Sequence, residues 1–427
     1  MSPAAAAPAF FLAVLVILLV CRVVCYAMGR IGQPPVVGEM VAGVLLGPSL
    51  LGLLAPGVQE ALFPEGLRPL LYVGGQIGLV VFMFGTGYEF SLRSIRGSAR
   101  TVGAVSLAGT VVPLALGVGV SLLGNQWTRL FRPDVSVVVS AAFVGVAVAI
   151  TAFPMLARII TERGLAGTRF GSLALACGAI DDALAWVLLA VVLSMHAASG
   201  GPALLTVGGA VLFAIVLTTV GRRLLGRVMA GTRFGGDQRV LITAVVLFAA
   251  AWFTDVIGLY AVFGAFCVGI ALPRSETAEA VLAKLMPIGR IVFLPLFFTY
   301  SGLNTRFALL GDPGLLLFTV VCVVAAVVGK FGACWGAARL AGEPPGVAVR
   351  VGALINARGL MQLIALNIGL QAGIVSPSLF TVLVVVALVT TVMTAPVLSW
   401  LDRREGRAPV SGNTDEFLLG AQSFPKS

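Results

Sequence analysis

Long apolar stretches, separated by short polar loops, run through most of this 427-residue chain. A helix that crosses a bilayer needs about 20 predominantly apolar residues. Lipid also offers no partner to the backbone, so spans must satisfy their own hydrogen bonds. The pattern predicts an all-α polytopic membrane protein with about thirteen transmembrane helices, at 9–29, 35–54, 70–88, 101–124, 134–158, 168–196, 202–221, 238–255, 257–273, 287–303, 314–340, 346–373 and 377–401.

Composition agrees with this assignment. The chain is 59% hydrophobic and 11% charged, whereas a soluble domain carries about 25% charged residues. The net charge of +10 comes from arginines in short loops, without the basic, aromatic-rich runs of nucleic-acid-binding proteins. The six cysteines lie inside apolar spans and lack the spacing of metal ligands. We therefore expect no nucleic-acid partner and no cofactor.

Loop charges predict an orientation in the membrane. Basic residues collect in alternate loops, such as 93–100, 158–169 and 222–239, which fall on one side of the bundle. Cytoplasmic loops carry the excess of basic residues in membrane proteins. We expect a multi-pass protein of the plasma membrane, with its N-terminus outside and a short, disordered cytoplasmic tail at 402–427.

Asp181 and Asp182 lie together within the apolar span 168–196. A carboxylate at that depth must be paired, protonated or bound to a cation. Consecutive helical residues point about 100° apart, so one can face a water-filled cavity and the other a neighbouring helix. The spacing leaves open which is which. A pair that only locks helices together is the structural alternative.

Lys330 is the one lysine inside an apolar span, since the only others are Lys284 in a loop and Lys426 in the tail. A buried lysine can lose its proton, whereas arginine keeps its own. This indicates a salt bridge to an aspartate and a part in proton coupling. The alternative is a side chain that snorkels to the interface.

Two spans are interrupted by residues that disfavour a continuous helix. Pro154 lies inside 134–158, and Asn356, Arg358 and Gly359 lie inside 346–373. Broken helices in matching places of two halves point to a transporter site. Thr151 and the freed backbone would supply neutral oxygens to a cation. An ordinary kink and a buried Arg–Asn network are the alternatives.

Several motifs, in order along the chain, resemble the monovalent cation:proton antiporter family, in the branch of bacterial sodium/proton antiporters and plant cation/proton exchangers. They are QPPVVGEM at 33–40 with GPS at 47–49, TAFP at 151–154, DDALAW at 181–186, FGAF at 263–266, LPLFF at 294–298, and Asn356 with Arg358, Gly359 and Leu360.

The resemblance implies one transmembrane domain over 1–401 with an inverted repeat. It implies a core at about 101–196 and 314–401, scaffold helices at about 9–88 and 238–303, and a homodimer. It further implies that Asp182 binds a monovalent cation, as its metal ligand, or a proton in competition, while Asp181 pairs with Lys330. Gln362 stands where many exchangers have glutamate and is expected to modulate pH response or cation choice.

The predicted function is secondary antiport of Na⁺ or K⁺ against protons by alternating access, with no catalytic residue and no enzymatic activity. A proton- or sodium-coupled transporter of an organic solute on the same scaffold is the alternative. An intramembrane aspartyl enzyme is disfavoured, because such aspartates usually face each other from two helices, whereas Asp181 and Asp182 are adjacent on one.

Overall fold

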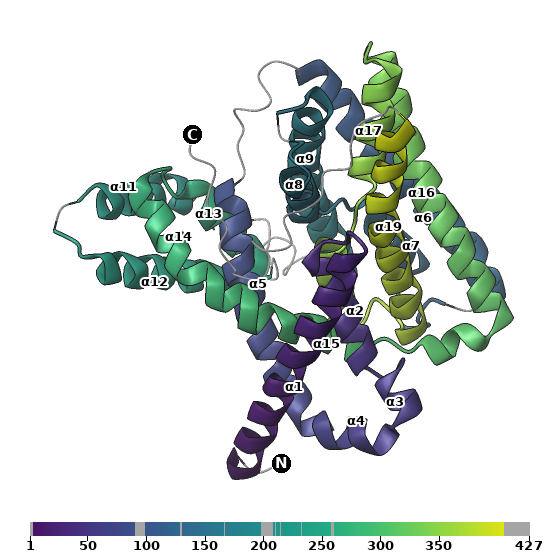
Figure 1. Ribbon diagram of the computed structural model, residues 1–427, viewed down its shortest axis with the longest axis horizontal. Helices are drawn as coiled ribbons and strands as arrows, with labels where there is room; N and C mark the ends of the chain where they lie inside the picture. The colour runs from purple at the N-terminus through teal and green to yellow at the C-terminus, as the bar shows by residue number, and fades with distance from the viewer. Residues whose placement is uncertain are drawn as a thin grey trace.

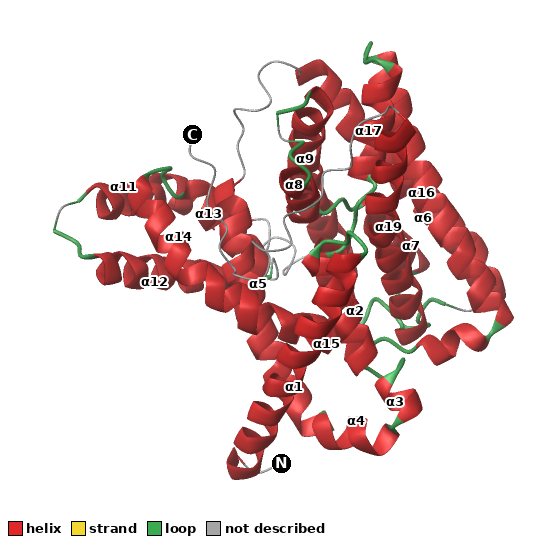
Figure 2. Cartoon of the chain, in the orientation of Figure 1, coloured by secondary structure: helices red, strands yellow, loops and turns green. Residues whose placement is uncertain are grey.

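The computed structural model describes residues 3–89, 99–128, 130–165, 167–197, 208–209, 211–213, 215–231, 233–257 and 260–404. All regular structure in these residues is helical (Figure 2). The α-helices are α1 (Pro3–Arg30), α2 (Pro35–Leu46), α3 (Leu51–Leu54), α4 (Pro56–Leu62), α5 (Arg68–Glu89), α6 (Ala99–Thr128), α7 (Val137–Ala149), α8 (Phe153–Glu162), α9 (Arg169–Ala197), α11 (Arg222–Ala230), α12 (Gly236–Val256), α13 (Ala261–Ala271), α14 (Glu276–Ile288), α15 (Leu294–Leu303), α16 (Pro313–Leu340), α17 (Pro345–Ile355), α18 (Leu360–Gln371) and α19 (Pro377–Arg404). Short 3₁₀ turns lie at Glu65–Leu67 and Phe307–Gly311, and π-helical turns at Leu217–Gly221 and Gly289–Phe293.

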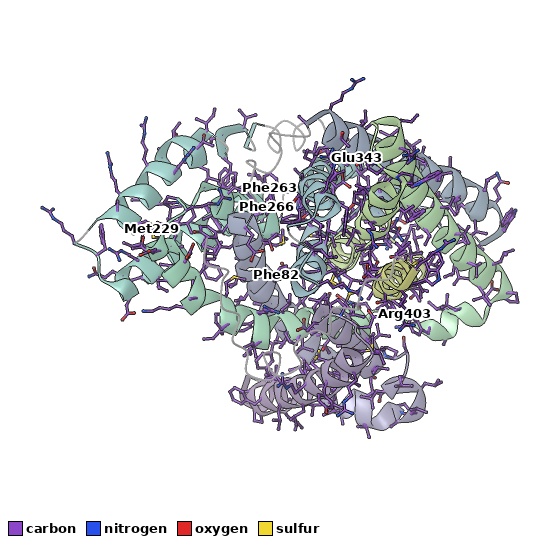
Figure 3. All side chains as sticks on the ribbon, turned by 45° about the horizontal axis from the view of Figure 1, so that its top comes forward. Phe82, Met229, Phe263, Phe266, Glu343 and Arg403 are labelled. Carbon is purple, nitrogen blue, oxygen red and sulfur yellow. The ribbon has the colours of Figure 1, made fainter. Side chains whose placement is uncertain are left out.

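The helices form two groups (Figure 1). In the aspartate group, α6–α9 pack with α16–α19, chiefly through α6 against α7 and α16. In the flanking group, α1–α5 pack with α11–α15, chiefly through α5 against α13 and α15 and through α2 against α1 and α15. Figure 3 shows Glu343 and Arg403 on the first group and Met229 and Phe263 on the second.

The aspartate group contains the same order of elements twice. The unbroken α6, the interrupted pair α7 and α8, and the unbroken α9 are matched by α16, the pair α17 and α18, and α19. The stretch Pro345–Gln371, which contains the second interruption, is the most deeply buried of the long apolar segments in the described residues. This architecture confirms the predicted class, an all-α membrane protein with two broken helices.

The exact count of thirteen spans stays a prediction. The described residues contain ten segments that are long and apolar enough to cross a membrane. The span expected at 134–158 divides into α7 and the start of α8, and the span expected at 257–273 contains the shorter apolar helix Ala261–Ala271. The span expected at 202–221 lies partly outside the described residues, as do residues 405–427 of the tail.

Glycines set the spacing between α2 and α15. A Cβ added at Gly302 would lie 1.9 Å from the carbonyl oxygen of Gly43, and one added at Gly43 would lie 2.2 Å from the carbonyl oxygen of Phe298. Both are closer than any side-chain carbon approaches a backbone oxygen. The two helices can pack at this distance only because neither residue has a side chain.

Gly302→Ala should therefore destabilise the protein by about 1–3 kcal/mol, because an added methyl group forces two packed backbones apart. Thermal unfolding in detergent measures the effect. Gly332→Ala is the control, since Gly332 lies inside α16 with nothing within 4 Å of its added Cβ. That change should be neutral or raise stability by roughly 0.5–1 kcal/mol. Equal unfolding temperatures for the two variants would contradict this account of the packing.

Candidate functional site

The two interrupted helices meet at their breaks. α7 ends at Ala149 and α8 begins at Phe153, while α17 ends at Ile355 and α18 begins at Leu360. The N–H of Ala152 donates to the carbonyl oxygen of Ala357, 3.2 Å away, so the two unwound segments are joined by a backbone hydrogen bond. Non-helical backbone at membrane depth needs such partners.

The residues predicted to cause the breaks lie at them or beside them. Pro154 is the second residue of α8 and so follows the break, at a position where a helix has no N–H bond to lose. Gly359 precedes α18 with φ +129°, a backbone conformation that favours glycine. The Asn356 amide is buried and its Nδ2 points toward the sulfur of Met393, 3.9 Å away.

Asp181 makes two contacts outside its own helix and is almost fully buried, at 3% exposed. Its Oδ2 accepts a hydrogen bond from Thr151 Oγ1 at 2.8 Å and one from Lys330 Nζ at 3.1 Å. The carboxylate thus connects α9 to the first break and to α16.

Asp182 points elsewhere and is fully buried. Its Oδ1 lies 3.4 Å from the backbone nitrogen of Phe153, the first residue of α8. The N-terminus of a helix carries a partial positive charge, which favours a carboxylate there. We expected one aspartate to face a water-filled cavity; in this structure both side chains are enclosed.

Lys330 lies inside α16 with a side chain that is fully buried, so it does not snorkel to the interface. Besides Asp181, its ammonium donates to the carbonyl oxygen of Ala149 at 2.7 Å. Ala149 ends α7, where the helix dipole is negative and the carbonyls lack helical partners. The one ammonium therefore neutralises a carboxylate and satisfies a backbone group freed by the break.

Arg358, beside the second break, is fully buried. Its Nη2 donates to the carbonyl oxygen of Ala326, within α16, at 3.2 Å. The freed carbonyl of Ala149 is taken by Lys330 instead. The Arg358 guanidinium therefore links the second break to α16.

The site has more acceptors than donors. Asp181 Oδ1 and Asp182 Oδ2 are buried oxygens that have no hydrogen-bond partner among the described residues. Buried polar atoms normally find partners, and here two carboxylates share one ammonium. If both are ionised the trio has a net charge of −1, which a monovalent cation or a proton would neutralise.

Gln362 lies in the first turn of α18 with a fully buried side chain. Its Nε2 donates to the carbonyl oxygen of Leu383 on α19 at 3.1 Å, and its Oε1 has no partner in the described part of the chain. The amide thus ties the second broken helix to α19. Its role in modulation stays a prediction.

Sequence reasoning expected freed backbone at the site but did not identify which groups belong to it. The N–H of Phe153 and the carbonyl of Ala149 contact Asp182 and Lys330, yet neither has a side chain that suggests such a role. The signal was the interruption itself, because a helix break frees donors on one side and acceptors on the other.

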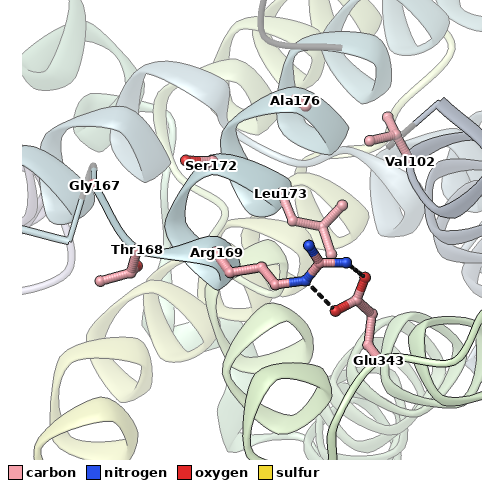
Figure 4. A pocket seen from close by; sticks show the side chains of 8 residues that line it. All are labelled: Val102, Gly167, Thr168, Arg169, Ser172, Leu173, Ala176 and Glu343. Atoms are coloured by element: carbon pink, nitrogen blue, oxygen red, sulfur yellow. Dashed lines mark hydrogen bonds and ion pairs between the residues drawn. The ribbon is translucent and has the colours of Figure 1, made fainter. Parts of the chain in front are cut away.

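A separate pocket of about 350 Å³ lies where α6, α9 and the loop before α17 meet (Figure 4). Arg169 crosses it and donates through Nε and Nη2 to both carboxylate oxygens of Glu343, at 2.7 Å each. Neither Asp181 nor Asp182 lines it; the lining residues are Val102, Gly167, Thr168, Arg169, Ser172, Leu173, Ala176 and Glu343. The Arg169–Glu343 pair connects the start of α9 to the loop before α17. The aspartate site is enclosed and is separate from this pocket.

Comparison with known proteins adds a family. A family model described as "Sodium/hydrogen exchanger, transmembrane" matches residues 14–401. The chain is 35% identical to Na(+)/H(+) antiporter NhaS4 of Synechocystis sp., over 90% of this chain and 95% of that protein. It is 32% identical to Cation/H(+) antiporter 17 of Arabidopsis thaliana and 29% identical to K(+)/H(+) antiporter 1 of Saccharomyces cerevisiae. These two matches include 92% and 89% of this chain. They span only 48% and 45% of the Arabidopsis and yeast proteins, so the chain is about half as long as these two relatives.

A solved structure shares the fold. The sodium proton antiporter MjNhaP1 of Methanocaldococcus jannaschii superposes with a TM-score of 0.65 at 12% identity, covering 91% of this chain and 95% of that one. The match to the family model spans most of the chain, from α1 to α19, and includes both broken helices. This chain therefore belongs to the sodium/hydrogen exchanger family of multi-pass membrane proteins.

Proposed function

We propose that this protein is a secondary antiporter that exchanges a monovalent cation, Na⁺ or K⁺, for protons. The observation that carries the proposal is the set of two buried carboxylates and one ammonium at the crossing of two broken helices. Family membership supports it, as do the names of the relatives, which are antiporters of Na⁺, K⁺ or unspecified cations against H⁺.

The proposed mechanism is competition at one site. Asp182 Oδ2, Asp181 Oδ1 and the hydroxyl oxygen of Thr151 are the candidate ligands, and such hard oxygens suit a small cation. A proton on Asp182 removes the charge that the cation needs, so either one or the other is bound. An uncompensated charge deep in protein or lipid is costly, which makes the loaded, neutralised site the form that moves.

The moving part is proposed to be the aspartate group, and the stationary part the flanking group. The packing supports this division, because the crossing, both aspartates and Lys330 lie within α6–α9 and α16–α19. We further propose that the flanking group forms a homodimer and that the protein lies in the plasma membrane with its arginine-rich loops in the cytoplasm.

An organic cargo is less compatible with this site. Both aspartates are enclosed, and the pocket of about 350 Å³ is lined by other residues. The two carboxylates also contact different partners, Lys330 with Thr151 on one side and the N–H of Phe153 on the other. This divergence disfavours a paired-aspartate enzyme mechanism as well.

The test uses purified protein in liposomes that contain a pH-sensitive dye and carry an imposed pH gradient. Sodium, potassium, lithium and choline salts are added in turn. Dye recovery with one or more metal cations but not with choline is expected, and it identifies the ion. Recovery with an organic solute alone, from protein shown to be inserted, would overturn the proposal.

A further inference from the structure

A polar seam joins the aspartate group to the flanking group away from the crossing. Asn367 and Gln371 lie four residues apart on α18 and therefore share one face of that helix. Asn367 Nδ2 donates to Ser301 Oγ on α15 at 2.7 Å, and Tyr72 on α5 donates through its hydroxyl to Gln371 Oε1 at 3.0 Å. We call Tyr72, Ser301, Asn367 and Gln371 the outer seam.

The seam is packed as well as hydrogen-bonded. Asn367 and Ser301 are 3% and 2% exposed. The ring of Tyr72 lies against that of Tyr300, the neighbour of Ser301, with centroids 5.3 Å apart. Two helices of the flanking group thus hold one face of α18, whose first turn lies at the crossing.

The seam lies toward the end of the molecule with few basic residues. α15 ends at Leu303 and α18 at Gln371, and the loops that follow them, up to the starts of α16 and α19, contain only Arg306 and Asp312 as charged residues. The link between α8 and α9, which contains Arg163, lies at the opposite end of the aspartate group (Figure 1), and we expect that end to be cytoplasmic. The seam therefore closes the side from which an external cation would approach.

We propose that the outer seam is the external gate of the transport path. This rests on the proposed exchange function. The hydrogen bonds hold the two groups together in the state described here, and both break when the aspartate group turns outward. Neutral amide and hydroxyl groups suit a gate, because water replaces their hydrogen bonds at little net cost.

Asn367 has a second hydrogen bond that does not cross the seam. Its Nδ2 also donates to the carbonyl oxygen of Leu363, one turn earlier on α18, at 2.8 Å. When the seam opens, this bond stays and only the one to Ser301 is lost. The amide therefore keeps its orientation and can re-form the contact on closing.

A reversible lock tests the gate. The six native cysteines are first replaced by alanine, and Ser301→Cys and Asn367→Cys are combined in that background. The two new cysteines are bridged by oxidation or by a one-carbon bis-methanethiosulfonate. Mass spectrometry confirms the bridge. Bridging should lower exchange by at least about tenfold, since the step that opens the site is blocked. Reduction should restore it.

A matched pair controls for the chemistry. Ser49 Oγ donates to the carbonyl oxygen of Thr305 at 2.8 Å, entirely within the flanking group. Bridging Ser49→Cys to Thr305→Cys should leave exchange unchanged. Undiminished exchange by the bridged 301–367 protein would overturn the gate but leave the exchange function standing. Absence of exchange in the unmodified chain would overturn the exchange function.

A second measurement does not depend on transport. Tyr72→Phe removes one hydrogen bond of the seam and keeps the ring against Tyr300, so the fold is preserved. In Ser301→Cys protein, it should speed labelling of residue 301 by an externally added, impermeant thiol reagent several-fold. Tyr88→Phe, at the other end of α5, should not change the labelling rate. Equal rates in both variants would overturn the gate.

Discussion

Replacing Asp182 with asparagine is expected to abolish cation-dependent proton exchange while leaving the fold intact. The amide neither carries a negative charge nor takes up a proton, so both competing cargoes lose their site. Loss of a charged partner in a buried ion pair costs about 3–5 kcal/mol, which is roughly 10²–10⁴-fold in affinity. The N–H of Phe153 now donates to Asp182 Oδ1. The amide oxygen of asparagine can accept the same hydrogen bond.

The liposome dye assay measures this effect for each cation, and thermal unfolding in detergent checks the fold. Asp134→Asn is the control, because Asp134 is 63% exposed in an ion pair with Arg132 and precedes α7, at the opposite end of that helix from the break. Exchange at the unmodified rate in the Asp182→Asn protein would contradict the competition mechanism. Loss of exchange in the Asp134→Asn protein would show that any charge change is disruptive.

Lys330→Met is expected to have the largest effect on stability, lowering the free energy of unfolding by about 3–5 kcal/mol. The substitution leaves Asp181 as a buried carboxylate without its ammonium partner, and it leaves the carbonyl oxygen of Ala149 without a donor. Both losses occur where the side chains are fully or almost fully buried, so water cannot replace the missing contacts.

A second substitution separates the two losses. In the double variant Asp181→Asn with Lys330→Met, the unpaired charge is gone, and most of the lost stability should return. Lys284→Met is the matched control, since Lys284 pairs with Asp237 at 2.7 Å with both side chains exposed. Its loss should change stability by about 1 kcal/mol or less. Stability of Lys330→Met equal to that of Lys284→Met would contradict the buried pair.

Much of this protein followed from local patterns in its sequence. Spans of about 20 apolar residues can only be helices in lipid, so the fold class was predictable. Pro154 and Gly359 marked the two interruptions, because each disfavours an uninterrupted helix. Asp181, Asp182 and Lys330 stood out as candidates, because ionisable residues are costly in apolar spans.

The number of spans was less predictable, for a physical reason. The apolar stretch at 134–158 is long enough in sequence, yet it contains the end of one helix, Val137–Ala149, and the start of another, Phe153–Glu162. Breaks interrupt the hydrogen-bond ladder without interrupting the hydrophobicity. A hydropathy pattern therefore records how much chain is buried and misses where the helix stops.

Local spacing left open which aspartate meets which partner; the family resemblance implied the Asp181–Lys330 pair, and the tertiary structure gives each carboxylate its contacts. Asp181 and Asp182 are equivalent in local sequence, and their difference arises from Lys330, 149 residues from Asp181, and from the N–H of Phe153. The second role of Lys330 joins it to Ala149, 181 residues away. Local pattern determined that charges are buried in this membrane domain. The packing of distant helices determined their partners, because burial is a property of a segment and pairing is a property of the assembled fold.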